Sequence, residues 1–112
     1  MSTDLLFGMS SLSLEYVQVK VAMKKNGVIV DPTGDTVRFA FKAVGTEPTA
    51  PDWVLGDWET EDEGTDDEEY LARCLVGPGG TITLADGTYA VWIKVTDNPE
   101  IPVRNVGRLR IS

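Results

Sequence analysis

The residues of this chain best suited to chemistry are carboxylates gathered in one short stretch. Residues 57–69, DWETEDEGTDDEE, contain nine acidic residues and no basic one. Such oxygen ligands suit Ca²⁺, but the spacing does not match the EF-hand loop, which needs ligands at fixed positions and a glycine at the sixth. Mutual repulsion disfavours the burial of so many carboxylates. We therefore expect a solvated loop without a metal over residues 57–69; the alternative is an acidic patch that meets a basic partner surface.

Nucleophilic catalysis lacks its usual residues, because the chain has no His and a single Cys. Histidine is the commonest general base at neutral pH. Cys74 alternates with Ala72 and Val76 in a strand-like pattern, where a free Cys typically acts as a small buried hydrophobe. The glycine-rich residues 77–80 are not followed by the Lys-Ser/Thr pair of a phosphate loop. We expect a hairpin turn there, no catalytic residue, no cofactor and no enzyme.

The net charge of −8 comes from one place in the sequence. Nine of the 18 acidic residues lie in 57–69, so the other nine face ten basic residues in the rest of the chain. Nucleic-acid binding requires basic residues clustered against phosphates, which a sequence pI near 4.3 disfavours. Anionic membrane surfaces are disfavoured for the same reason, and no apolar run approaches about 20 residues. We expect neither nucleic acid nor membrane as a partner.

The elements that must position these residues are predicted to be β-strands. Apolar and polar residues alternate with a period of two over residues 17–24, 37–42 and 89–95. Shorter candidate strands cover residues 28–30, 53–55, 70–75, 81–84 and 107–111. Turn-forming pairs such as Asn26-Gly27 separate them. Seven or eight short strands in 112 residues predict a single all-β domain, an antiparallel sandwich with a small β-barrel as the alternative.

The position of Tyr89 makes this prediction more specific. It follows Asp86-Gly87-Thr88 and begins the penultimate predicted strand. In immunoglobulin-like sandwiches a Tyr near this point donates a hydrogen bond to upstream backbone, the tyrosine corner. The alternative is an ordinary strand Tyr after an Asp-Gly turn. We expect an immunoglobulin-like (Ig-like) sandwich without the disulfide of antibody domains.

The tryptophans are candidates for both core and surface. Trp53 and Trp58 are five residues apart and would lie on opposite faces of a plain strand, although Gly56 permits a bulge. At least one of them is expected in the core. Trp92 is expected to point away from the core, beside Ala40 across the sheet. There it is covered by a loop of its own chain or presented to a partner.

The N-terminus carries an unusual group of apolar residues. We interpret residues 1–13 as an apolar arm and residues 14–112 as the domain. Leu5, Met9 and Leu12 share a face if the segment is helical. A helix this short is marginal alone, so we expect it to dock on a neighbouring subunit, or alternatively on its own sandwich. The candidate partner-binding residues are Leu5, Leu6, Phe7, Met9, Leu12 and Trp92.

Several stretches resemble a small family of virion structural proteins encoded by tailed phages of actinobacteria. They are residues 31–33, 37–41, 51–53, 56–59, 72–80 and 87–103. The resemblance rests on strand and turn residues and implies a non-enzymatic protein that binds neighbouring subunits. A head-associated role, as a capsid decoration or minor capsid protein, is the leading expectation. A head–tail connector or tail component is the alternative.

The resemblance also implies the surroundings of the protein. The expected partners are the major capsid protein or head–tail subunits, contacted by repeated copies in a symmetric particle. The expected location is the virion, after synthesis in the host cytoplasm. A carbohydrate- or host-surface-binding Ig-like module, with the tryptophans as a stacking platform, is the second class of function.

Overall fold

Ten β-strands and one 3-10 helix make up the computed structural model, which describes residues 5–25, 28–61, 69–96 and 101–112. The strands are β1 Leu5–Met9, β2 Glu15–Val21, β3 Met23–Lys25, β4 Val28–Val30, β5 Thr36–Ala43, β6 Val54–Leu55, β7 Asp57–Glu61, β8 Glu69–Val76, β9 Gly87–Thr96 and β10 Val103–Ile111. The helix η1 is Ala50–Asp52. The predicted all-β class is confirmed for the described residues.

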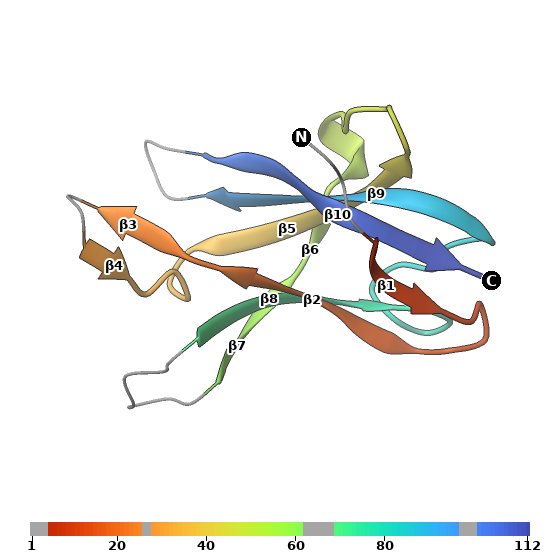
Figure 1. Cartoon of the computed structure of the whole chain (residues 1–112), viewed down its shortest axis with the longest axis horizontal. Coiled ribbons are helices and arrows are strands. Elements are labelled where there is room, and N and C mark those ends of the chain that lie inside the picture. The colour runs from red at the N-terminus through yellow and green to blue at the C-terminus, as the bar shows by residue number, and fades with distance from the viewer. Residues whose placement is uncertain (1–4, 26–27, 62–68, 97–100) are drawn as a thin grey trace.

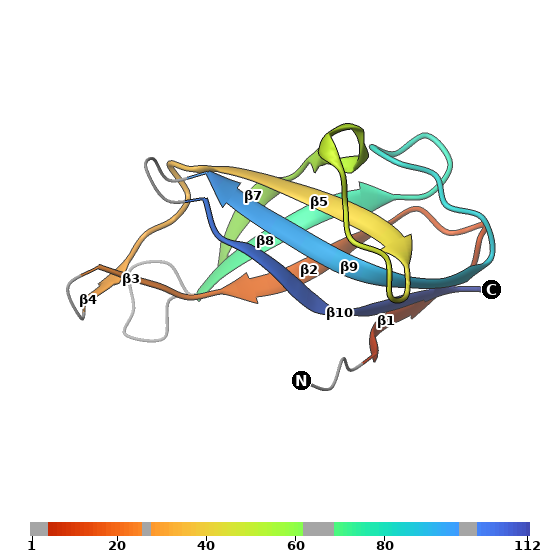
Figure 2. The same cartoon turned by 90° about the horizontal axis from the view of Figure 1, so that it is seen from above.

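The strands form two main sheets that pack face to face (Figures 1 and 2). The larger sheet has the order β1-β10-β9-β5-β6, and the smaller has the order β2-β8-β7. β3 and β4 form a separate two-stranded ribbon at one end of the molecule. β1 runs parallel to β10, while the other pairings are antiparallel. A mixed five-stranded sheet thus curls over a three-stranded one, as in a sandwich or half-barrel.

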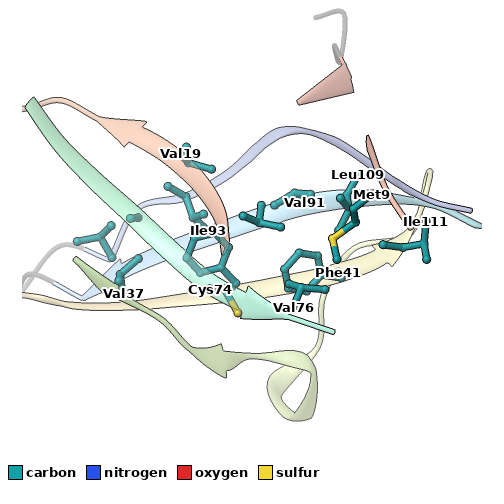
Figure 3. Close-up of a cluster of buried hydrophobic side chains, with 14 residues drawn as sticks. Met9, Val19, Val37, Phe41, Cys74, Val76, Val91, Ile93, Leu109 and Ile111 are labelled. Carbon is teal, nitrogen blue, oxygen red and sulfur yellow. The ribbon is translucent and has the colours of Figure 1, made fainter. Parts of the chain in front are cut away.

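Alternating apolar residues of both sheets meet in one core (Figure 3). Val17 of β2, Phe39 of β5 and Val91 of β9 are all fully buried. The rings of Phe39 and Phe41 lie 6.2 Å apart, centroid to centroid, and are stacked. Complete burial of a side chain as large as that of Phe39 contributes about 1.5–3 kcal/mol. The period-two pattern of the sequence therefore selects which face of each strand closes the core.

The two sheets are joined covalently at Gly56. β6 ends at Leu55 in the large sheet, and β7 begins at Asp57 in the small sheet. The Gly56 amide donates to the carbonyl of Val37 over 2.9 Å. A Cβ atom at this residue would lie 2.8 Å from both the Arg73 carbonyl oxygen and the Phe39 ring. Only glycine fits where the chain crosses between the sheets this close to the core.

The N-terminal segment differs from the helix and the separate arm that we expected. Leu5–Met9 forms β1, the edge strand of the large sheet, in parallel register with β10. The Met9 side chain is 6% exposed and belongs to the core cluster. Two backbone hydrogen bonds, from Ser112 N to Met9 O and from Ser11 N to Ser112 O, extend this pairing. Exposed donors and acceptors at the edge of β10 favour a strand over a short isolated helix.

Two further expectations need correction. Residues 57–61 and 69 are not loop residues, because they form β7 and the start of β8, with Glu61 opposite Glu69. Residues 62–68 lie outside the described part of the chain. Residues 81–84 do not form a strand and contribute only a single bridge between Ile82 and Val76. A strand position requires only that alternate side chains reach water, so acidic residues are tolerated on the outward side of β7.

Tyr89 makes the backbone contact that its position predicts. Its hydroxyl donates to the carbonyl of Ala85 over 2.7 Å. Tyr89 lies near the start of β9, the penultimate strand, and packs against the core. The bond therefore fixes the loop before β9 to the strand itself.

Replacing Gly56 tests the crossing between the sheets. We expect Gly56→Ala to lower the free energy of unfolding by about 1–3 kcal/mol, because the new methyl group overlaps the Phe39 ring and the Arg73 carbonyl. Chemical denaturation followed by tryptophan fluorescence measures this. Gly34→Ala is the matched control: no atom lies within 4 Å of a Cβ there, so stability stays equal or rises slightly. Equal stability of the two variants would contradict the close approach.

Truncation of Met9 tests the position of the N-terminal strand. We expect Met9→Ala to cost about 2–5 kcal/mol of unfolding free energy, as for other large-to-small changes in a core. Leu12→Ala should stay within about 0.5 kcal/mol of the parent, because Leu12 is 88% exposed. Thermal and urea melts of both variants provide the measurement. A neutral Met9→Ala variant would show that β1 does not pack on its own sandwich.

Candidate interaction faces

The outward face of the large sheet is the first candidate, and we call it the Trp92 face. Its side chains alternate with the buried residues of β5, β9 and β10, so they point away from the core. They are Arg38, Ala40, Lys42, Ala90, Trp92, Lys94, Asn105, Arg108 and Arg110. The prediction that Trp92 points outward opposite Ala40 is confirmed by this register.

Part of this face is covered by the chain itself. Figure 2 shows the segment between β5 and η1 crossing over β9 and β5. Lys42 Nζ forms an ion pair of 3.3 Å with Asp52 in η1, and Lys94 Nζ lies 4.6 Å from the ring centroid of Trp53. Ala40 is completely buried without belonging to the core cluster. The segment 44–53 is thus held against the outside of the sheet by one ion pair and one cation–π contact.

Trp53 lies outside the large sheet, whereas Trp58 lies between the two sheets. Trp53 shares the outward side with Lys94. Trp58 packs against the core, and its Nε1 donates to the carbonyl of Asp35 over 2.8 Å. The expectation that at least one of the two helps to fill the core is confirmed by Trp58. The chain crosses between the sheets at Gly56, so Trp53 is placed by the large sheet and Trp58 by the small one.

The Trp92 face carries positive charge that is only partly compensated. Lys42 is ion-paired, whereas within the described residues Arg38, Lys94, Arg108 and Arg110 have no carboxylate within 4 Å. Arg38 and Lys94 are directly opposite in the β5–β9 ladder. Like charges in that position destabilise a sheet. The Arg38–Lys94 pair thus keeps positive charge on this face at a cost to the stability of the large sheet.

Two donors on the same face have no acceptor among the described residues. They are the buried atoms Trp92 Nε1 and Arg108 Nε. Asn105, opposite Trp92, uses its Oδ1 to accept from the Gly107 amide over 3.2 Å. Unsatisfied buried donors cost free energy, so these two atoms lower the stability of the fold.

The opposite side of the sandwich carries a polar network centred on Arg73 of β8. Arg73 Nε donates to Asp57 Oδ1 over 2.8 Å, and its Nη1 lies 3.5 Å from Glu59 Oε2. The guanidinium carbon lies 4.2 Å from the centre of the Tyr16 ring, and Gln18 donates to Glu59. The hydrogen bond with Asp57 raises the pKa of Arg73. One cation therefore serves two carboxylates of β7.

A pocket of about 250 Å³ opens beside this network. It is lined by Tyr16, Leu55, Gly56, Asp57, Arg73, Cys74, Leu75 and Thr81. Leu55 at its rim is 60% exposed. Its polar lining consists of Tyr16, Asp57 and Arg73 of this network together with Thr81.

Cys74 lies on the inner face of β8, as predicted. Its side chain is 1% exposed, and it belongs to the core cluster. Burial, with a smaller contribution from Asp57, raises the pKa of the thiol from 9.0 to about 11. The neutral thiol is the stable form in the fold, so the residue packs as a small hydrophobe.

Of the six candidate partner-binding residues, the three whose side chains the structure describes are not brought together. Met9 is in the core, Leu12 is almost fully exposed in the turn after β1, and Trp92 lies partly buried on the large sheet. The side chains of Leu5, Leu6 and Phe7 lie outside the described residues, although their backbone is in β1. Sequence reasoning missed the cations around Trp92. In the sequence, each of these cations occupies a polar position of a predicted strand. Which of them lie side by side follows only from the strand register.

The described residues contain no group of three or more His, Cys, Asp or Glu side chains placed to hold a metal ion. No helix in the same part of the chain is long and apolar enough to cross a membrane. Comparisons with known proteins give no match: no family model, no curated protein and no solved structure is similar to this chain.

The reactivity of Cys74 tests its placement. At pH 8 the thiolate fraction of the folded protein should be about a hundredfold lower than in the unfolded chain, given the raised pKa. Labelling by a thiol reagent should therefore be slow in buffer and fast in denaturant. The thiol's contribution to stability is full below its unfolded pKa and is lost as the pH rises towards 11. Rapid labelling of the folded protein at pH 8 would mean that β8 presents its other face to the core.

Proposed function

We propose that this chain is a non-enzymatic structural subunit of a tailed-phage particle, which acts by binding neighbouring subunits. A head-associated position, as a capsid decoration or minor capsid protein, is the leading form of the proposal, and a connector or tail component is its alternative. Support comes from the resemblance of residues 31–33, 37–41, 51–53, 56–59, 72–80 and 87–103 to virion proteins of actinobacterial phages. The expected location is the virion, with the major capsid protein or head–tail subunits as partners.

We further propose that the fold is Ig-like. Its support is the strand order: in Ig domains two sheets hold B, E and D on one side and C, F and G on the other, with C′ added next to C in variable-type domains. Taking β2, β5, β6, β7, β8, β9 and β10 as B, C, C′, D, E, F and G gives the observed sheet orders. The Tyr89–Ala85 hydrogen bond matches a tyrosine corner at the start of F.

The single observation that carries a binding role is the uncompensated charge on the Trp92 face. Arg38 and Lys94 are opposite each other, without a carboxylate nearby in the described chain. Such an arrangement lowers the stability of an isolated domain and is typical of sites kept for function. A surface that gains from an external anion is expected of a subunit that completes its contacts in an assembly.

Composition of purified particles tests the proposal. Mass spectrometry of density-gradient-purified virions should find the chain in a fixed ratio to the major capsid protein, while an infection-stage enzyme from the same lysate serves as the control and is absent. Immunogold labelling then locates the chain. Label on heads supports the head-associated form, and label confined to tails overturns that form in favour of the alternative. Absence from washed particles overturns the virion role.

The second candidate is a carbohydrate- or host-surface-binding module, and one observation favours it. Trp53 and Trp92 both lie on the outward side of the large sheet, with Asn105 opposite Trp92. Sugars stack on aromatic rings and bond to amides, but the Asn105 amide oxygen is engaged by Gly107. Glycan-array binding that is lost in Trp92→Ala and kept in Tyr16→Ala, on the opposite face, would establish this function. Absence of binding by the parent protein would exclude it.

A further inference from the structure

We propose that the Trp92 face binds an extended acidic segment of a neighbouring protein chain, which lies along the strands and places alternate carboxylates against the unpaired cations. The proposal rests on the assembly role above, because it states what kind of surface a neighbouring subunit offers to this face. It is carried by the excess of positive charge on the face, by the spacing of the cations along the strands, and by the indole between them.

The charge of this face is not balanced by the chain itself. Its five basic residues are Arg38, Lys42, Lys94, Arg108 and Arg110. The segment 44–53, which crosses the same side (Figure 2), brings the two carboxylates of Glu47 and Asp52. Asp52 pairs with Lys42, and no carboxylate of the described chain lies within 4 Å of the other four cations. The described residues of this side therefore carry three positive charges in excess, which favour an external anion.

The unpaired cations are spread along the strands. Arg38 and Lys94 are directly opposite each other in the β5–β9 ladder. Arg108 and Arg110 pair with the other end of β9, where Arg110 is opposite Thr88. Lys94 and Thr88 are six residues apart in β9, and a strand rises about 3.3 Å per residue. The cations therefore span about 20 Å along the sheet.

This spacing fits an extended polypeptide better than a nucleic acid. In an extended segment alternate side chains share one side and are about 7 Å apart, so about 20 Å of it presents three or four carboxylates. Duplex DNA carries about 12 phosphate charges over the same length, at one per about 1.7 Å of helix axis. The face offers four unpaired cations, on a chain whose net charge of −8 repels a polyphosphate. The number of charges thus matches an acidic segment of protein.

The middle of the face is suited to contact with protein. Trp92 is half-buried and lies opposite Ala40 on one side and Asn105 on the other. Val103, opposite Lys94, is 39% exposed. Aromatic and Arg side chains are among the types most enriched at protein interfaces. A segment bound along this face covers the indole and the valine as well as the charges.

Fluorescence anisotropy with labelled, end-blocked synthetic peptides tests the proposal on the full chain. The peptide ETETETE carries its four carboxylates at alternate residues, and EEEETTT carries the same residues with the carboxylates consecutive. The variant Arg38→Ala with Arg110→Ala removes one unpaired cation from each end of the face. The control, Lys20→Ala with Lys25→Ala, removes the same charge from β2 and β3, which lie outside the large sheet. Circular dichroism melts establish that both are folded.

We expect the parent and the control to bind ETETETE at about 0.05 M salt and to lose it as the salt rises to about 0.5 M, because screening weakens the ion pairs. The Arg38→Ala, Arg110→Ala variant should bind about 2- to 30-fold more weakly, through the loss of two exposed ion pairs. EEEETTT should bind the parent more weakly than ETETETE, because half of its carboxylates point away from the face. Equal binding of the two peptides, or of the variant and the control, would overturn the proposal.

The remaining outcomes separate this proposal from the virion role and from a nucleic-acid partner. A parent that binds neither peptide at millimolar concentration, yet is present in purified particles, would overturn the acidic-segment proposal and leave the virion role in place. Binding of ETETETE by a chain that is absent from washed particles would overturn the virion role alone. A fluorescent DNA duplex that binds the parent more tightly than ETETETE does, and the variant more weakly, would show that the occupant is nucleic acid and would overturn the proposal.

Discussion

Packing of the two sheets around Phe39, at the point where the chain crosses between them, is the constraint on which the rest of the structure depends. Phe39 is fully buried, and its ring lies where any side chain at Gly56 would be. The crossing fixes how closely β6 and β7 approach. It also separates Trp53, outside the large sheet, from Trp58, which packs against the core.

Given that core, the charges of the outward faces follow from strand alternation. Each buried apolar residue of β5, β9 and β10 has neighbours that must point outwards, and at five of those positions the sequence places Arg or Lys. In β7 the same alternation sends Trp58 inwards and Asp57 and Glu59 outwards. The fold thus gathers these cations on the outward side of the large sheet. The binding role that we propose uses them.

Patterns confined to one segment could be predicted from the sequence, and patterns that need a distant partner could not. The strands over residues 37–42 and 89–95, the buried Cys74 and the Tyr89 contact depend on local alternation and turns. β1 depends on pairing with β10, about a hundred residues later in the chain, which no local signal reveals. β7 was obscured because acidic residues are rare in strands. The pairing of Arg38 with Lys94 appears only once the register is known.

The central claim is that the uncompensated cations of the Trp92 face hold this chain in an assembly, and competition between two chains for places in the particle tests it most directly. Host cells that supply equal amounts of the parent and of an Arg38→Ala, Arg110→Ala variant during infection offer both chains to the same particles. Neither Arg makes an ion pair with a described carboxylate, so the variant should fold like the parent. The account predicts that mass spectrometry of purified particles finds the parent in clear excess over the variant. Equal incorporation of the two folded chains would contradict it.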